Sequence, residues 1–155
     1  MKKIFLMVAI MATAFTQIGF AQQVQGSALL PLYYNVKDAL IGGNAKLAAS
    51  KAGELVKALN GADTKTLSAT NRDKLLEHAG KIAGSKDLNS QREHFAGLST
   101  AMIVLAKGSK LSTEPVYQMY CPMKKSNWLS SEKAVKNPYY GSSMLTCGKV
   151  VETIK

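Results

Sequence analysis

The sequence predicts a mostly α protein, an up-and-down four-helix bundle with a small extended, hairpin-like cap at its C-terminus. Two observations carry this prediction. Between Ala28 and Lys107, apolar residues recur at helical spacing in four stretches separated by short polar loops. After Gly108 the pattern changes to short extended segments interrupted by proline and turn residues. The composition, rich in Ala, Leu and Lys with only four Pro, also favours helices.

Two helices are predicted in the first part of the chain. The apolar stripe of the first consists of Leu29, Leu32, Tyr33, Val36, Leu40 and Ile41. Gly42 and Gly43 end it, and Asn44 can cap the next helix. The stripe of that second helix consists of Ala48, Ala52, Leu55, Val56 and Leu59. Asn60-Gly61 is a typical helix end, so the second helix should stop there.

Two further helices follow. The third is predicted from Ser68 or Thr70 to Gly84, and its apolar stripe is Leu75, Leu76, Ala79 and Ile82. Asp87 can cap the fourth, which Gly108 ends. The stripe of the fourth helix is Phe95, Leu98, Ala101, Met102 and Leu105. Short loops between these helices predict that neighbours in the chain pack antiparallel.

The C-terminal tail is predicted to fold as a cap on the helices. "TEPVYQMYCPM" alternates in polarity and contains Pro115 and Pro122, so it should be extended. "WLSSEKAVKNPYYGSS" predicts a short helix after Ser130, followed by an Asn-Pro turn. "SMLTCGKVVETI" is rich in β-branched residues and predicts a strand. The tail is too short to form a domain of its own.

The N-terminus has the pattern of a signal peptide at residues 1–21. A start with two lysines precedes an apolar stretch, Ile4–Phe15, and small residues at Gly19 and Ala21 precede a cleavage point before Gln22. The apolar stretch is too short to span a bilayer. We therefore expect an exported, periplasmic, soluble protein.

The remainder, residues 22–155, has the length of a single helical-bundle domain, with a segment rich in Cys and Met at 115–154. The chain carries 20 Lys and Arg against 10 Asp and Glu. Export and the even spread of the lysines argue against nucleic acid as a partner. A solvated basic surface and attraction to anionic lipids or an acidic partner both remain open.

The tail also holds a group of sulfur-containing side chains. In an extended chain, residues two apart face the same side, so Met119, Cys121 and Met123 should project together. Thiolate and thioether sulfurs are soft donors that suit Cu(I) or Ag(I). Cys147 and Met144 could close such a site if the tail folds back on itself, with a turn or bulge between them.

Two alternatives accompany this interpretation. Two cysteines in an exported domain commonly pair, and a disulfide between Cys121 and Cys147 would contribute roughly 3–4 kcal/mol in the chain-entropy model. Methionines are also common core residues. His94 lies on the apolar side of the fourth helix, where it is either a core residue with a hydrogen-bond partner or a further ligand.

Three segments, "QREHFAGLS", "CPMKKSNWLS" and "NPYYGSSMLTCG", together with the helical layout, resemble the domain-of-unknown-function family 3347. Its members are small exported bacterial domains, found alone or attached to membrane-fusion adaptors of copper/silver efflux systems. The resemblance spans about Leu30 to Ile154. It implies involvement with Cu(I) or Ag(I), with four residues at the motif positions: His94, Cys121, Met123 and Cys147.

We therefore expect a periplasmic soft-metal-binding protein, accessory to heavy-metal efflux or tolerance, whose partner could be a membrane-fusion adaptor. Its Cu(I) or Ag(I) ion would bind to two thiolates, with further donors among the other candidates. The full candidate set is Cys121, Met123, Cys147, His94, Met144 and Met119. The alternative is a disulfide-stabilised helical interaction module of the cell envelope without metal. No HExxH, nucleophile elbow or phosphate-binding glycine loop is present, so no enzyme is expected.

Overall fold

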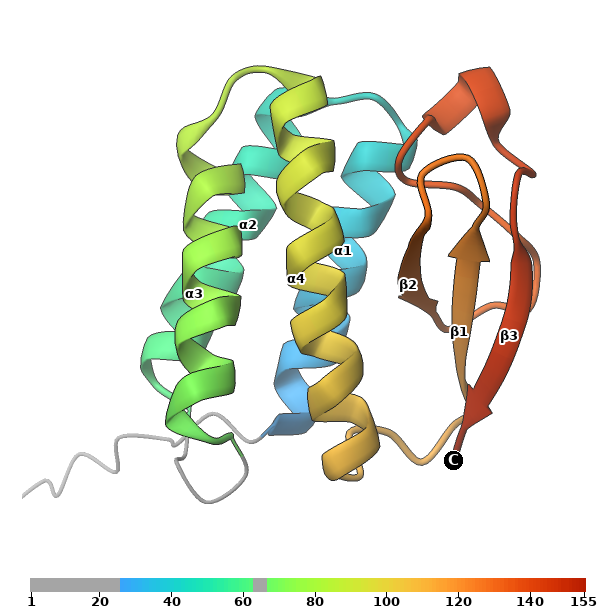
Figure 1. Cartoon of the computed structure of the whole chain (residues 1–155). Coiled ribbons are helices and arrows are strands. Elements are labelled where there is room, and N and C mark those ends of the chain that lie inside the picture. Colours follow the sequence, from blue (N-terminus) through green and yellow to red (C-terminus); the bar gives the residue numbers. More distant parts are fainter. Residues whose placement is uncertain (1–25, 63–66) are drawn as a thin grey trace, which may run out of the picture.

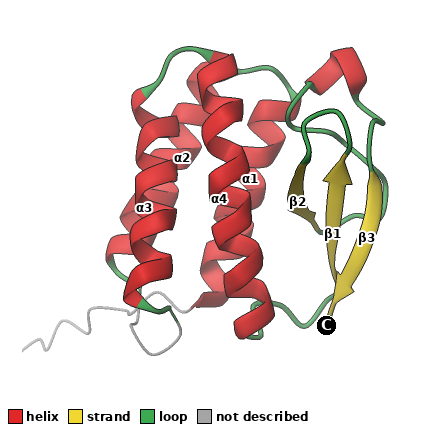
Figure 2. Cartoon of the chain, viewed as in Figure 1, coloured by secondary structure: helices red, strands yellow, loops and turns green. Residues whose placement is uncertain are grey.

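The computed structural model describes residues 26–62 and 67–155, and the segment predicted as a signal peptide lies outside these ranges. Figures 1 and 2 show the helices lying beside a small antiparallel sheet. The helices are α1 (Leu29–Ile41), α2 (Ala45–Asn60), α3 (Ala69–Gly84) and α4 (Leu88–Gly108). The strands are β1 (Val116–Cys121), β2 (Ser126–Ser130) and β3 (Lys149–Ile154). Short 3-10 turns occur at Gly26–Ala28 and Gly141–Met144. The mostly α prediction is confirmed.

Side-chain caps begin three of these helices, and two of the caps, Asn44 and Asp87, are the predicted ones. Asn44 Oδ1 accepts a hydrogen bond from the Leu47 amide at 2.9 Å, and Asp87 Oδ1 accepts one from the Ser90 amide at 2.7 Å. At α3 the cap is Ser68, whose Oγ accepts from the Asn71 amide at 3.4 Å. Each cap gives a partner to an amide that the first turn of a helix leaves without one.

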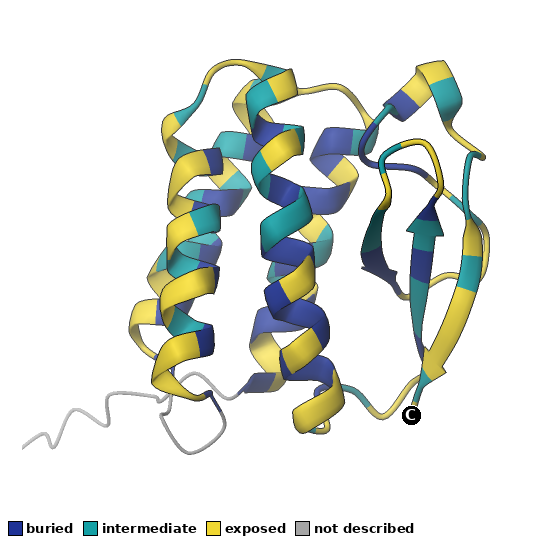
Figure 3. Ribbon diagram, viewed as in Figure 1, coloured by how far each residue is buried: buried dark blue, intermediate teal, exposed yellow. Residues whose placement is uncertain are grey.

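The core forms where helices that follow each other in the chain pack together, and α4 also packs against β2. Figure 3 shows buried faces turned inward on all four helices. The largest fully buried side chains include Trp128, Tyr33, Phe95 and Met102. None of the helices in the described ranges is long and apolar enough to cross a membrane.

One hydrogen-bonded residue links helices to sheet. Tyr33 Oη lies 2.7 Å from Ser99 Oγ and accepts a hydrogen bond from the Leu129 amide at 3.1 Å. The ring of Tyr33 stacks on Phe95 with centroids 5.2 Å apart. A single side chain of α1 therefore contacts both α4 and β2.

The sheet has the strand order β2-β1-β3, so β1 is central and both of its neighbours are antiparallel to it. Residues 122–125 form the turn of the β1–β2 hairpin, in which Lys125 has a positive φ of 53°. A register shift between Gln118 and Met119 interrupts the pairing of β1 with β3. The predicted cap is therefore a hairpin to which a third strand has been added.

The tail differs from the prediction in three places. The strand predicted over residues 143–154 is shorter, because only Lys149–Ile154 is a strand and Gly141–Met144 is a 3-10 turn. Strand β2 was not predicted, because "SNWLS" is too short and polar to show alternation. The predicted short helix after Ser130 is wrong, because residues 131–134 form bends and the one helical turn of the tail is Gly141–Met144. Residues 131–134 are all exposed, so a helix there would have no apolar face to pack, and short helices need such packing.

Candidate functional site

Cys121 is the last residue of β1 and is fully buried. The chain turns immediately after it, because Pro122 cannot continue the ladder of hydrogen bonds. This turn directs the Lys124 amide back toward the strand end, where it donates to Cys121 Sγ at 3.4 Å. A second donor, Asn137 Nδ2, approaches the same sulfur atom at 3.2 Å.

Cys147 lies just before β3, and its Sγ is 3.9 Å from Cys121 Sγ. Both cysteines are free thiols, and Cys147 is half-buried. The close approach depends on Gly148, whose φ is +147°. A Cβ at that position would lie 2.8 Å from Trp128 Cη2 and 3.0 Å from the Tyr120 carbonyl oxygen. Any other residue would push the chain that carries Cys147 away from the sheet.

Asn137 connects the two cysteine segments and is itself fully buried. Its Nδ2 donates to Cys121 Sγ and, at 2.6 Å, to the Cys147 carbonyl oxygen. Its Oδ1 accepts from the Tyr139 and Tyr140 amides at 2.8 and 3.3 Å. The side chain therefore fixes the Asn-Pro turn and holds both cysteines against it.

The environment of the pair favours protonated Cys147. Desolvation raises the pKa of the Cys147 thiol, and the neighbouring Cys121 thiol raises it further, against a lowering contribution from the Met123 backbone. A thiolate at one cysteine disfavours a second thiolate 3.9 Å away. A cation between the two sulfur atoms would remove this repulsion.

The three candidate methionines lie in different environments. Met119 is fully buried in the core and pairs with Trp128 and Val150 across the sheet. Met123 is 63% exposed, because the alternation of β1 ends at Cys121 and Met123 belongs to the turn. Met144 is half-buried, and its carbonyl oxygen accepts from the Cys147 amide at 3.0 Å. Met123 and Met144 lie within three residues of a cysteine in the sequence and are partly exposed. Met119 is a residue of the hydrophobic core.

His94 is not grouped with the cysteines. It lies on α4 beside His78 of α3, with ring centroids 6.2 Å apart. Within residues 26–62 and 67–155, no group of three or more His, Cys, Asp or Glu side chains could hold a metal ion. The structure therefore brings Cys121 and Cys147 together, whereas His94 lies next to His78.

Asn137 was missed by the sequence analysis, which used Asn-Pro only as a turn signal. An Asn side chain that accepts from amides two or three residues later is a common feature of such turns, so the position carried a usable signal. The hydrogen bonds from Asn137 and Lys124 to the Cys121 sulfur depend on tertiary contacts, and no sequence pattern indicated them.

Comparison with protein-family models gives a match over the helical part of the chain. The family model described as protein of unknown function (DUF3347) matches residues 29–114. No curated protein and no solved structure matches the chain. The matched range covers the four helices and the segment "QREHFAGLS", and it ends before β1. Both cysteines and the two other motif segments lie outside it.

Proposed function

The chain belongs to the DUF3347 family, whose description names no function, and we propose on its own residues that it binds one Cu(I) or Ag(I) ion between Cys121 and Cys147. The observation that carries this proposal is the 3.9 Å separation of two free sulfur atoms. An ion that holds two thiolates at about 2.3 Å each places them about 3.8 Å apart at the tetrahedral angle and about 4.6 Å apart in a line. Either arrangement needs less than about 1 Å of adjustment.

The donor set favours soft ions. Two thiolates suit Cu(I) and Ag(I), while Zn(II) commonly takes four protein ligands in a structural site. The exposed Met123 and the half-buried Met144 are the thioethers that could complete the site. His94 lies beside His78, so we leave it out of this site.

The N–H donors around Cys121 support ligation. The Lys124 amide and Asn137 Nδ2 both donate to its sulfur atom, and a thiolate bound to a metal still accepts such hydrogen bonds. The same donors orient the sulfur before an ion arrives. Little ordering would then be needed on binding, which favours affinity.

We propose that the protein is exported to the periplasm and acts there as an accessory to heavy-metal efflux or tolerance. A membrane-fusion adaptor would be its partner, and the protein would have no catalytic role. The N-terminal pattern of residues 1–21 and the family resemblance support this assignment. We also infer an up-and-down order of the four helices, supported by their short loops and by packing between chain neighbours.

The second candidate is the oxidised form, a disulfide-stabilised interaction module without metal. The same contact favours it, since a disulfide needs the sulfur atoms to move from 3.9 Å to about 2.05 Å. Oxidation consumes both thiolates and therefore prevents metal binding at the pair. The mass of native protein separates the two, because a disulfide lowers it by two hydrogens and a metal ion raises it.

The first prediction tests the metal site by titrating fully reduced protein with Cu(I) against a competing chelator. We expect uptake of one ion, and we expect Cys121→Ser and Cys147→Ser each to raise the Kd at least a hundredfold, because each removes a thiolate. Met119→Leu is the matched control, since it changes a sulfur-bearing side chain of the core at nearly constant volume. Reduced wild-type protein that takes up no stoichiometric Cu(I) would show that the proposal is wrong.

A further inference from the structure

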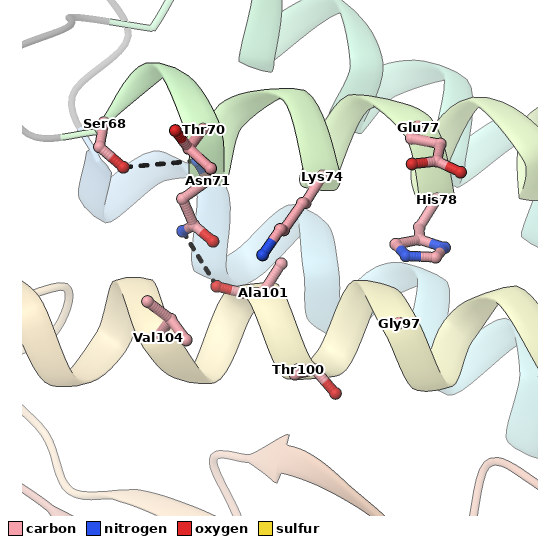
Figure 4. A pocket seen from close by; sticks show the side chains of 10 residues that line it. All are labelled: Ser68, Thr70, Asn71, Lys74, Glu77, His78, Gly97, Thr100, Ala101 and Val104. Carbon is pink, nitrogen blue, oxygen red and sulfur yellow. Dashed lines mark hydrogen bonds between the residues drawn. The ribbon is translucent and has the colours of Figure 1, made fainter.

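Two histidines meet between α3 and α4, and they form no common ligand group with the cysteine pair in the part of the chain that the structure describes. The ring centroids of His78 and His94 are 6.2 Å apart, and their planes are inclined by 37°. Figure 4 shows the His78 ring pointing from α3 toward α4, where Gly97 lies opposite. His94 precedes Gly97 by three residues, so both lie on neighbouring turns of one face of α4.

Gly97 makes room for the His78 ring. A Cβ at position 97 would lie 2.3 Å from both Nε2 and Cε1 of His78. The other nitrogen, Nδ1, is buried and has no hydrogen-bond partner among the described residues. A buried nitrogen without a partner costs free energy, and a ligand that accepts or supplies a bond there would recover it.

His78 also lines a groove between the two helices. The groove has a volume of about 520 Å³, and Figure 4 shows Lys74, Glu77 and Thr100 along it with Ala101 and Val104. His78 is half-buried on the wall of this groove, whereas its Nδ1 is fully buried, so an ion would need a small movement of the ring to reach that nitrogen. The Glu77 carboxylate interacts electrostatically with both imidazoles and adds negative charge beside them.

The distance between the ring centroids leaves room for an ion with two imidazole ligands. With about 2.0 Å from metal to nitrogen and about 1.2 Å from nitrogen to ring centre, a linear arrangement places the centroids about 6.4 Å apart. A tetrahedral angle would place them about 5.2 Å apart. The observed 6.2 Å is close to the linear value. No third His, Cys, Asp or Glu completes a site in the described chain, which disfavours ions that require four protein ligands.

We propose that His78 and His94 form a second metal site, which binds one monovalent ion of two-coordinate preference, Ag(I) or Cu(I), between α3 and α4. Burial lowers the pKa of His78, so its ring is held in the neutral form that ligates metals. The site uses neither thiol, and it therefore stands independently of the function proposed for the cysteines.

The experiment follows the imidazole nitrogens by NMR while a full-chain Cys121→Ser/Cys147→Ser variant is titrated with Ag(I) in chloride-free buffer. We expect one equivalent to shift the nitrogen signals of His78 and His94 together. His78→Gln and His94→Gln should each raise the Kd at least tenfold. If the double variant does not fold, the same signals are followed in wild-type protein through the second equivalent of Ag(I).

Two glycine variants provide the matched control. Gly97→Ala leaves both histidines in place but displaces the His78 ring, so it should raise the Kd at least tenfold. Gly53→Ala adds the same methyl group to α2, where nothing lies within 4 Å, and should leave the Kd unchanged. Imidazole signals that do not move with Ag(I), or equal Kd values for Gly97→Ala and Gly53→Ala, would overturn the proposal. Binding by the thiol-free variant would support it even if the cysteine pair binds nothing.

Discussion

Asn137 shows how a polar side chain can be fully buried at low cost. Its side-chain nitrogen and oxygen make four hydrogen bonds to residues that are buried or half-buried. The partners are two backbone amides, one carbonyl oxygen and one sulfur atom. Removing it would leave several of these groups without partners at once, and each such group costs about 1–3 kcal/mol. It is therefore the residue on which the geometry of the cysteine pair depends most.

We predict that Asn137→Ala lowers the free energy of unfolding by about 2–4 kcal/mol, measured by urea denaturation of reduced protein. Asn89→Ala is the matched control, since Asn89 is exposed on α4 and should change stability by less than about 0.5 kcal/mol. Equal effects of the two substitutions would contradict the role assigned to Asn137.

A second residue-scale prediction concerns pH. Burial, first of all, lowers the pKa of His78 below its ordinary 6.5, with Glu77 opposing and His94 and Lys81 adding to the shift. The unfolded chain then binds the proton more readily than the folded one, so stability rises with pH. The contribution is present above about pH 6.5 and is lost as pH falls through the folded pKa.

Accordingly, with a chelator present, His78→Gln should flatten the dependence of unfolding free energy on pH between about 7 and 5. The measurement is a set of urea titrations across that range. A wild-type slope that survives the substitution unchanged would show that His78 does not carry it.

Sequence reasoning did well at the residue scale where chemistry is local. Asn44, Ser68 and Asp87 cap their helices because a side-chain oxygen needs only the amides two or three residues ahead. It did less well at Met123, because alternation predicts a shared face only while the strand continues. It could not pair His94 with His78, since that contact requires knowing how α3 and α4 lie against each other.

At the scale of elements, the helices were predictable and the tail was only partly so. Each helix has a stripe of apolar residues long enough to show its period, and each ends where glycine or a polar loop follows. The strands are five or six residues long, and β3 is exposed along most of its length. Alternation and β-branched residues indicated extended chain at β1 and β3, but the pairing of β2 and β3 with β1 depends on tertiary structure that no local pattern reports.

Two glycines in different elements predict opposite effects of the same substitution. Gly148→Ala should lower the free energy of unfolding by about 1–3 kcal/mol, because its φ of +147° and its contacts with Trp128 and Tyr120 exclude a side chain. Gly80→Ala lies in α3 with nothing within 4 Å and should raise it by about 0.5–1 kcal/mol. Urea denaturation measures both, and a stabilising Gly148→Ala would refute the packing described at this turn.

At the scale of the whole molecule, the contacts between helices and sheet decide whether the two unfold together as one cooperative unit. The family match covers the helices alone, yet Tyr33 bonds to Ser99 on α4 and to Leu129 on β2. Trp128, Met119 and Val116 of the sheet also belong to the same buried cluster as the helical core. Shared burial of this kind predicts a single transition.

We predict that helix loss, followed by far-ultraviolet circular dichroism in urea, coincides with exposure of the sheet. Sheet exposure can be measured by pulse alkylation of Cys121 in a Cys147→Ser variant, because the fully buried thiol reacts only when the sheet opens. Midpoints that differ by more than experimental error would mean that residues 115–155 unfold separately from the helices.

Trp128 is the only tryptophan of the chain and is fully buried. The edge of its indole borders the backbone of Gly148, directly after Cys147, and the Trp128 and Tyr139 rings meet in a T-shaped arrangement with centroids 5.9 Å apart. A displacement of the Cys147 segment therefore changes the surroundings of the one tryptophan, whose fluorescence can be excited selectively. The protein carries its own optical reporter, so the arrival of an ion or the closure of a disulfide can be timed in a stopped-flow instrument without a label.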